Sequence, residues 1–423
     1  MSSSCQSRKL LAINFGGLGD EVLFLPTLKS IKSAFPSWHI TLLTEPRSRS
    51  ILEVTDLVNA GITFDIKKRP LLPADYIALI YLIRQGRYDV VLSSGSSPLV
   101  SILLFLSGIR QRVGYDSGLL GRLLLTNPVL LKRNQHAVYM YHDLVRGLGI
   151  ALEPSPPEIA VDAQSRQSMS DFLQEGSLPE GDTIPSTTGS AAPAQRLLRV
   201  LIHPGTSKLA LLKGIIKTWH PANWAWLIGK LLDRADVQVI LSGGPDDEET
   251  IGQIKEHLLS MGIDEFMPAS PKKVAESGLR QSCLASRLTL AYGRTRSLRD
   301  LAALIDLSDL LVCVDSAPMH IGVGLKKNLV ALFGPTDPDK LLFPDSRFIA
   351  IAEDRKALPA TDVPGKDADS CQGGSLKRPL DSRSAQPQLS PGVSIQRDIV
   401  FRTVEDQLHS IAARGSFQES RRP

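Results

Sequence analysis

Cysteine, aromatic residues and long apolar runs are all scarce in this 423-residue sequence, and each shortage excludes a class of protein. The aromatic fraction of 5% is too low for a carbohydrate-binding surface lined with exposed rings. The longest apolar run, from Pro98 to Ile109, has about a dozen residues, whereas a membrane-spanning helix needs about 20. The four cysteines lack the close spacing of a metal site or a disulfide framework: Cys5, Cys283, Cys313 and Cys371.

A strong charge of either sign is also missing. The net charge is +4, and no block of basic residues alternates with aromatic ones, so we expect no nucleic-acid partner. The first 21 residues contain no apolar core of the kind that a signal peptide needs, and we therefore expect a cytoplasmic location. The apolar fraction of 43% and the charged fraction of 22% are typical of a globular protein.

Short strands rich in β-branched residues alternate with segments of helical period, which is typical of a parallel α/β sheet. The alternation restarts after a polar stretch rich in serine, proline and glycine, so we expect two α/β domains. The expected organisation is a Rossmann-like domain at 8–160, a linker or disordered insertion at 161–197, a second Rossmann-like domain at 198–354, a low-complexity flexible segment at 355–396 and a C-terminal helix at 397–414. Two such halves place a ligand in the crevice between them, beside the carboxyl ends of strands.

The first motif follows the first expected strand and reads Gly16-Gly17-Leu18-Gly19-Asp20. Glycines at such a junction let a ligand approach the backbone, and the start of the helix favours anions. Two interpretations of Asp20 remain open at this point. It is either a helix cap or a carboxylate that takes a proton from an incoming hydroxyl.

The second motif, His203 to Ser207, follows the first strand of the second half. Its Gly-Thr-Ser turn, together with a lysine, predicts a cradle for a diphosphate. Three lysines follow within the next ten positions, Lys208, Lys213 and Lys217, and the pattern leaves open which of them faces a phosphate.

Two further motifs follow strands in the second half. The turn from Ser242 to Glu248 contains Asp247, which either caps the next helix or holds a ribose diol. The segment Asp315-Ser316-Ala317-Pro318-Met319-His320 combines a small-residue turn with a helix that starts at a proline, which favours an anion site. It is followed by a Phe-Gly-Pro-Thr-Asp-Pro sequence at 333–338.

Taken together, these motifs resemble glycosyltransferase family 9, the heptosyltransferase-like enzymes of lipopolysaccharide assembly. The resemblance covers about residues 9–155 and 198–350, and its most specific part is the pair of motifs at 315–320 and 333–338. Ala317 stands where the family's motif has glycine. The resemblance implies the GT-B fold, in which two Rossmann-like domains face a central cleft.

The resemblance also implies an inverting transfer that needs neither a metal nor a cofactor. It implies that Asp20 is the general base, with Gly17 and Gly19 in the loop on the acceptor side. The implied donor-binding residues lie in the second half: Thr206, Ser207, Lys217, Asp247, Asp315, Ser316 and His320. The first domain then takes the acceptor and the second the donor.

The implied donor is a nucleotide sugar, with an ADP-linked heptose favoured, and the implied acceptor is a lipopolysaccharide-core or related glycolipid. Such an acceptor implies peripheral contact with the cytoplasmic face of the inner membrane. Two alternatives remain: a nucleotide-sugar 2-epimerase of the same fold, and a non-catalytic nucleotide-binding protein.

Overall fold

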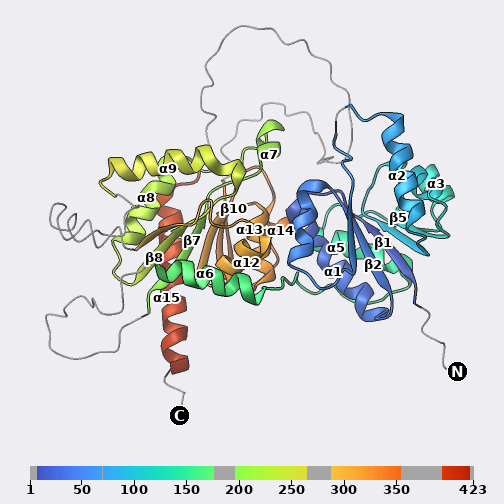
Figure 1. The fold of residues 1–423 in the computed structure, drawn as a ribbon. Coiled ribbons are helices and arrows are strands. Elements are labelled where there is room, and N and C mark those ends of the chain that lie inside the picture. Colours follow the sequence, from blue (N-terminus) through green and yellow to red (C-terminus); the bar gives the residue numbers. More distant parts are fainter. Residues whose placement is uncertain (1–6, 69, 176–195, 264–286, 354–392, 420–423) are drawn as a thin grey trace, which may run out of the picture. The chain divides into compact units, whose positions relative to one another are not determined.

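The computed structural model describes residues 7–68, 70–175, 196–263, 287–353 and 393–419. The chain divides into two compact units, with residues up to 158 in the first and most of the later chain in the second. Each unit contains one six-stranded sheet (Figure 1). In the described part of the chain, no helix combines the length and the apolar character needed to cross a membrane.

The first unit is built on a wholly parallel sheet with the strand order β3-β2-β1-β4-β5-β6. Its strands are β1 (Lys9–Ile13), β2 (His39–Thr44), β3 (Ala60–Thr63), β4 (Val90–Ser93), β5 (Gln111–Tyr115) and β6 (Asn127–Val129). Its helices are α1 (Leu18–Ala34), η1 (Pro46–Glu53), α2 (Pro73–Gln85), α3 (Pro98–Leu106), α4 (Leu119–Leu124), α5 (Ala137–His142) and η2 (Asp143–Leu148). The strand order reverses between β1 and β4, and this is where a doubly wound sheet binds ligands.

The second unit repeats this topology with the order β12-β11-β10-β7-β8-β9. Its strands are β7 (Leu198–His203), β8 (Val237–Leu241), β9 (Leu288–Leu290), β10 (Leu310–Val314), β11 (Asn328–Phe333) and β12 (Phe348–Ala352). Its helices are α6 (Ala163–Glu175), α7 (Lys208–Leu212), α8 (Pro221–Leu232), η3 (Pro245–Asp247), α9 (Glu248–Ser260), α12 (Leu298–Asp306), α13 (Ala317–Gly324) and α15 (Arg397–Glu419). The short helix α14 (Pro338–Leu341) begins in the second unit, but its last three residues are grouped with the first. The strand order reverses between β7 and β10.

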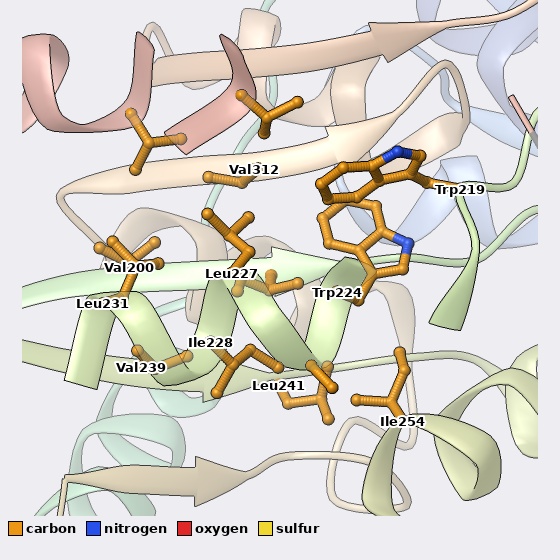
Figure 2. Close-up of a cluster of buried hydrophobic side chains, with 14 of the residues drawn as sticks. Val200, Trp219, Trp224, Leu227, Ile228, Leu231, Val239, Leu241, Ile254 and Val312 are labelled. Atoms are coloured by element: carbon orange, nitrogen blue, oxygen red, sulfur yellow. The ribbon is translucent and has the colours of Figure 1, made fainter. Parts of the chain in front are cut away.

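The core of the second unit lies between its sheet and helices α8, α9 and α15. Trp219 and Trp224 are fully buried there and meet edge to face, with ring centroids 5.1 Å apart (Figure 2). The strands β8 and β10 are buried along their whole length, as expected for parallel strands that are covered on both faces.

The expected linker at 161–197 is wrong for its first third, because residues 163–175 form the helix α6. Met169 and Leu173, four positions apart, are buried where α6 packs against α12. The large apolar residues of the segment, Met169, Phe172 and Leu173, are confined to one turn and a half, which is too short a periodic signal to predict this helix. Packing against α12 stabilises it. Residues 176–195 lie outside the described chain.

The expected flexible segment at 355–396 lies mostly outside the described residues, but its last four residues are described. Val393 and Ile395 are buried in the core of the second unit, so the segment ends earlier than expected. The Val393 amide donates to the carbonyl of Thr218, and the Trp219 ring nitrogen donates to the carbonyl of Ile395. The C-terminal helix is confirmed as an element, with α15 extending to residue 419.

Candidate functional site

The predicted motifs lie at the carboxyl edges of the two sheets. Residues 14–20 follow β1, at the reversal point of the first sheet. Thr206 and Ser207 follow β7, and Asp315 follows β10, which pairs directly with β7. Each sheet therefore presents its motifs where a doubly wound fold binds ligands.

Asp20 is half-buried in the first turn of α1, and both of its carboxylate oxygens accept hydrogen bonds. Oδ2 accepts the backbone N–H of Gly17 at 2.8 Å, and Oδ1 accepts the hydroxyl of Tyr141 at 3.1 Å. The first bond caps the helix, so the capping role of Asp20 is part of the structure. The second fixes the carboxylate against α5 and leaves lone pairs on both oxygens for a further donor.

Gly16 and Gly17 allow this conformation. A Cβ atom on Gly16 would overlap the Asp20 side chain, so only glycine lets Asp20 fold back over the loop. Gly17 is the N-cap residue and supplies the N–H that Asp20 binds, while Gly19 lies in the first turn of α1. Gly17 and Gly16, the second of which was not a predicted site residue, therefore position the carboxylate of Asp20, whereas no contact links Gly19 to it in the described structure.

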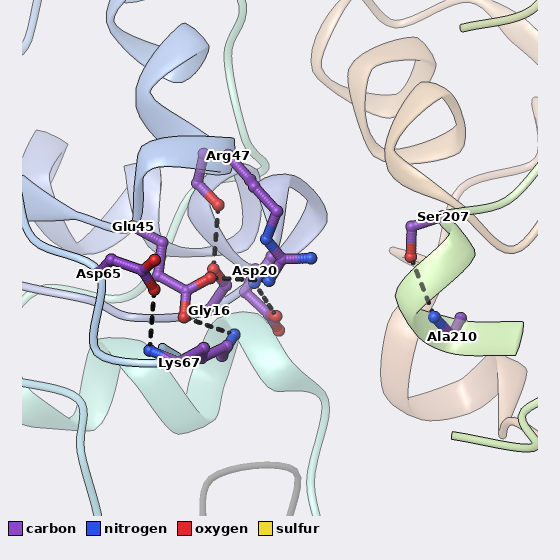
Figure 3. Close-up of polar contacts among 10 residues, drawn as sticks. Gly16, Asp20, Glu45, Arg47, Asp65, Lys67, Ser207 and Ala210 are labelled. Atoms are coloured by element: carbon purple, nitrogen blue, oxygen red, sulfur yellow. Dashed lines mark hydrogen bonds and ion pairs between the residues drawn. The ribbon is translucent and has the colours of Figure 1, made fainter. Parts of the chain in front are cut away.

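A buried charge cluster lies beside this loop (Figure 3). The carboxylate of Glu45 is almost fully buried and pairs with Arg47 at 2.8 Å and with Lys67 at 3.0 Å. Glu21 is buried equally well. Burial, and then the negative charge of Asp20, raise the pKa of Glu21 well above its usual range. Glu21 is therefore more readily protonated than an ordinary glutamate, and sequence reasoning did not identify either glutamate.

In the second unit, the structure brings Lys217 and Asp315 together. The Lys217 ammonium lies 2.6 Å from Oδ2 of Asp315, and the Thr336 hydroxyl donates to the same oxygen at 2.6 Å. Asp315 directly follows β10, and Lys217 arrives from the segment before α8. A Cβ atom on Gly334 would meet the carbonyl oxygen of Ile216, so the glycine lets the lysine segment pass close to the end of β11.

The helix α13 begins directly after this carboxylate. Ser316 is its N-cap in an extended conformation, and Pro318 lies in its first turn, where a missing N–H costs little. Ala317 does not adopt a positive φ, so the alanine is accommodated without backbone strain. His320 lies one turn further along α13 and is buried.

The three candidate lysines differ in their exposure to solvent. Lys208 and Lys213 are exposed at the two ends of the short helix α7, whereas Lys217 is mostly buried against Asp315. The hydroxyl of Ser207 accepts the backbone N–H of Ala210 at 3.3 Å and so caps α7 (Figure 3). Thr206 is buried at the end of β7. Of the three lysines, only Lys217 is held at the edge where β7 and β10 end.

Asp247 is a buried carboxylate at the end of η3. Its Oδ2 accepts the backbone N–H of Gly244 at 2.7 Å and lies 3.9 Å from Nε2 of His203. Burial raises the pKa of Asp247 and lowers that of His203, and the attraction between the two charged forms opposes both changes. A Cβ atom on Gly205 would overlap the carboxylate of Asp247, so the turns after β7 and β8 lie in contact.

Two hydrogen-bonding partners of the predicted residues were missed. Tyr141 lies 121 positions from Asp20, and no local pattern connects them. Thr336 stands within the Phe-Gly-Pro-Thr-Asp-Pro sequence, which had been recognised as a motif without assigning a role to its threonine. The parallel pairing of β10 with β11 could have indicated Thr336, because the ends of adjacent strands lie side by side.

Comparison with known proteins agrees with this arrangement. The family model of glycosyltransferase family 9 (heptosyltransferase) matches residues 76–362, a range that includes the second-unit motifs but not Asp20. Lipopolysaccharide heptosyltransferase 3 of Escherichia coli is 26% identical over 332 residues, which cover 75% of this chain and 81% of that protein.

Solved structures show the same fold. The family 9 glycosyltransferase from Veillonella parvula has a TM-score of 0.61 and 21% identity, covering 82% of this chain and 86% of its own. The E. coli heptosyltransferase WaaC with ADP-2-deoxy-2-fluoro heptose has a TM-score of 0.54 and 19% identity, covering 82% of this chain and 93% of its own. The chain has the GT-B fold, belongs to glycosyltransferase family 9, the heptosyltransferase family, and is a glycosyltransferase.

Proposed function

We propose that this enzyme transfers heptose from an ADP-linked donor to a lipopolysaccharide-core or related glycolipid, with inversion at the anomeric carbon and without a metal. The observation that supports this proposal best is the Lys217–Asp315 pair at the reversal point of the second sheet. Lys217 is fixed at that edge by Asp315, which directly precedes the N-cap of α13. A lysine beside a helix N-terminus suits the diphosphate of a nucleotide sugar.

The donor belongs to the second unit in this proposal. Negative charge grows on the nucleoside diphosphate as it leaves. Lys217 and the positive N-terminal end of α13 would stabilise that charge, together with the turn at Thr206 and Ser207. This assignment lets protein groups provide the electrostatic stabilisation that a divalent cation provides in other transferases. Asp247 is the candidate for the ribose diol, and Ser316 and His320 complete the donor loop.

The acceptor belongs to the first unit. Asp20 would accept the proton of the acceptor hydroxyl as that oxygen attacks the anomeric carbon. The bonds from Gly17 and Tyr141 hold its carboxylate in one orientation, which a general base requires. Arg47 and Lys67, held by the buried Glu45, offer positive charge to an anionic acceptor.

The names of the relatives support the choice of donor and acceptor. Two of the proteins compared are heptosyltransferases; one carries lipopolysaccharide in its name, and the solved structure of the other contains an ADP-linked heptose analogue. A glycolipid acceptor would bring the enzyme to the cytoplasmic face of the inner membrane.

The test is a transfer assay in which mass spectrometry detects the product and NMR determines the configuration of product and donor. ADP-heptose is offered with a lipopolysaccharide-core acceptor, with and without a chelator. We expect a product with inverted anomeric configuration at an unchanged rate in the chelator. Isomerised donor without transfer would instead indicate an epimerase. A thermal-shift comparison of ADP, GDP, UDP and dTDP tests the nucleotide, since only a bound ligand raises the melting temperature.

A further inference from the structure

Helices α2, α3 and α4 of the first unit carry an unusual number of apolar side chains on their outer surface. They form the layer that covers one face of the sheet, and α2 and α3 pack side by side (Figure 1). The exposed apolar residues are Tyr76, Ile77 and Tyr81 on α2, Leu99, Phe105 and Leu106 on α3, and Leu119, Leu120 and Leu123 on α4. We call this set the apolar face.

The requirements of the core do not explain these residues. A different set of apolar side chains on the same helices already packs on the sheet, including Leu79 and Ile83 of α2 and Leu103 and Leu104 of α3. The exposed fractions on the outer side are large: 67% for Ile77, 73% for Leu119 and 68% for Leu123. A surface helix normally places polar residues there, and neighbouring helices that all depart from this rule indicate a binding surface.

Two arginines hold the three helices together as one surface. Arg84 of α2 donates to the carbonyl of Leu106 at the end of α3, with Nη2 at 2.7 Å. Arg112 donates to the carbonyl of Leu124 at the end of α4 at 2.7 Å, and its guanidinium lies 5.5 Å from the centre of the Phe105 ring. These bonds, and the packing of α3 against both α2 and α4, fix the three helices next to one another.

Positive charge borders the apolar face. A hollow of about 620 Å³ lies at the amino ends of β1, β4 and β5, just beyond the ends of α2 and α3, and Arg8, Arg87 and Arg110 line it. Asp89 is the one carboxylate in its lining, and it accepts the backbone N–H of Lys9 at 2.8 Å. Within the described chain, the Arg87 and Arg110 side chains have no ion-pair partner. The hollow therefore suits the phosphate groups of lipids.

We propose that the apolar face docks the first unit on a bilayer that contains anionic lipids. The exposed leucine, isoleucine and aromatic side chains enter the boundary between headgroups and acyl chains, and the arginines beside them bind lipid phosphates. This combination of an apolar surface and bordering positive charge is what distinguishes a bilayer from a protein partner. The inference does not depend on the identity of the donor sugar or of the acceptor.

The test is co-sedimentation of the full-length protein with vesicles. Vesicles of phosphatidylcholine alone are compared with vesicles that also contain about 30% phosphatidylglycerol, since anionic headgroups attract the arginines. We expect binding to the anionic vesicles. The variant with Ile77→Ser and Leu123→Ser should lose roughly tenfold or more in vesicle affinity, because both side chains lose their transfer into lipid. Arg110→Gln should bind several-fold more weakly to the anionic vesicles only.

The matched control is Leu259→Ser, which removes an apolar side chain that is 52% exposed on α9 of the second unit. It should bind vesicles like the wild type. The double variant should keep the wild-type melting temperature and ADP affinity, which separates the loss of docking from misfolding and from failure of the donor site. Equal vesicle binding by the double variant and the wild type would overturn the proposal. So would a wild-type dimer in sedimentation analysis that the double variant abolishes, because the apolar face would then be a contact between copies of the chain.

Discussion

The ammonium of Lys217 lies 2.6 Å from a carboxylate oxygen of Asp315 that also accepts the Thr336 hydroxyl. Asp315 is 2% exposed, and the side chain of Lys217 is 17% exposed. A lysine normally loses considerable side-chain entropy when it binds a ligand. Because the buried aspartate already fixes the ammonium, part of that loss would be incurred before any ligand binds at the proposed donor site.

We expect Lys217→Ala to weaken nucleoside diphosphate binding by roughly ten- to hundredfold, as is typical for loss of a charge-assisted hydrogen bond. Nucleoside binding should change much less. Isothermal titration calorimetry with ADP and adenosine measures both. Lys208→Ala and Lys213→Ala are the controls, because both lysines are exposed. If either control loses ADP binding while Lys217→Ala keeps it, the phosphate-binding lysine is misassigned.

Asp20→Asn should lower the rate of transfer by about a hundredfold or more, since general-base catalysis contributes about 10²–10⁴. The amide oxygen can still accept the N–H of Gly17, so the helix cap and the donor affinity should change little. Tyr141→Phe should have a smaller effect on the rate, because it removes only a bond that orients the carboxylate. Steady-state kinetics with a saturating donor separates the two variants. A near-normal rate for Asp20→Asn would leave Asp20 with its capping role alone.

The buried Glu21 predicts a pH dependence of stability. Because its pKa is raised on folding from a usual value of 4.5, the folded state holds a proton that the unfolded state releases. The stabilising contribution is complete below the unfolded pKa and is lost as the pH rises through the folded pKa. Glu21→Gln cannot ionise, so its melting temperature should rise relative to the wild type as the pH increases from about 5 to about 8.

The expected difference is a few degrees, because about 1 kcal/mol shifts the melting temperature of a 150–250-residue unit by about 2–4 °C. Glu45→Gln is the matched contrast, since this equally buried carboxylate pairs with Arg47 and Lys67. Its loss should destabilise the protein at neutral pH by about 1–3 kcal/mol. A constant difference between Glu21→Gln and the wild type at every pH would contradict the raised pKa.

Two glycine substitutions should have opposite effects on stability. Gly205→Ala places a Cβ against the carboxylate of Asp247, and we expect a loss of about 1–3 kcal/mol in the free energy of unfolding. In Gly252→Ala the added Cβ points into open space on α9, and the free energy of unfolding should rise by about 0.5–1 kcal/mol. Urea denaturation measures both. Equal free energies of unfolding for the two variants would show that the turn containing Asp247 can shift to make room for the added Cβ without loss of stability.

The sequence predicts the strands well where burial on both faces makes them continuous apolar runs. The alternating pattern predicts strands at 39–44, 237–241, 310–314 and 328–333, and the structure has β2, β8, β10 and β11 with the same bounds. The edge strands β6 and β12 are not among the strands that the pattern predicts. β6 has only three residues and β12 is partly exposed, so their apolar signal is weak. The pattern also predicts a helix from Pro221 to Leu232, and α8 has these bounds, since His220 caps it and a proline starts it.

The positions of the candidate residues along the chain were predictable, but their pairing was not. A polar residue after a strand indicates the correct edge of the sheet, as it does for Asp20 and Asp315. Lys217 was distinguished from Lys208 and Lys213 only by the family resemblance. Which lysine meets Asp315 depends on the path of the chain between β7 and α8, including the short helix α7. The exposure of the apolar residues of α2 and α3 was not predicted, because a helix that is apolar all round is usually buried.

The attachment of Val393 and Ile395 beside Lys217 has a practical consequence for dissecting the protein. A fragment that begins near residue 196 and ends at 353 contains every strand of the second sheet. It lacks Val393 and Ile395, whose backbone groups form hydrogen bonds with Thr218 and Trp219. An isolated second unit intended for crystallisation or ligand screening must therefore retain the chain from 393 onward. Internal deletions should be designed to rejoin at or before residue 392.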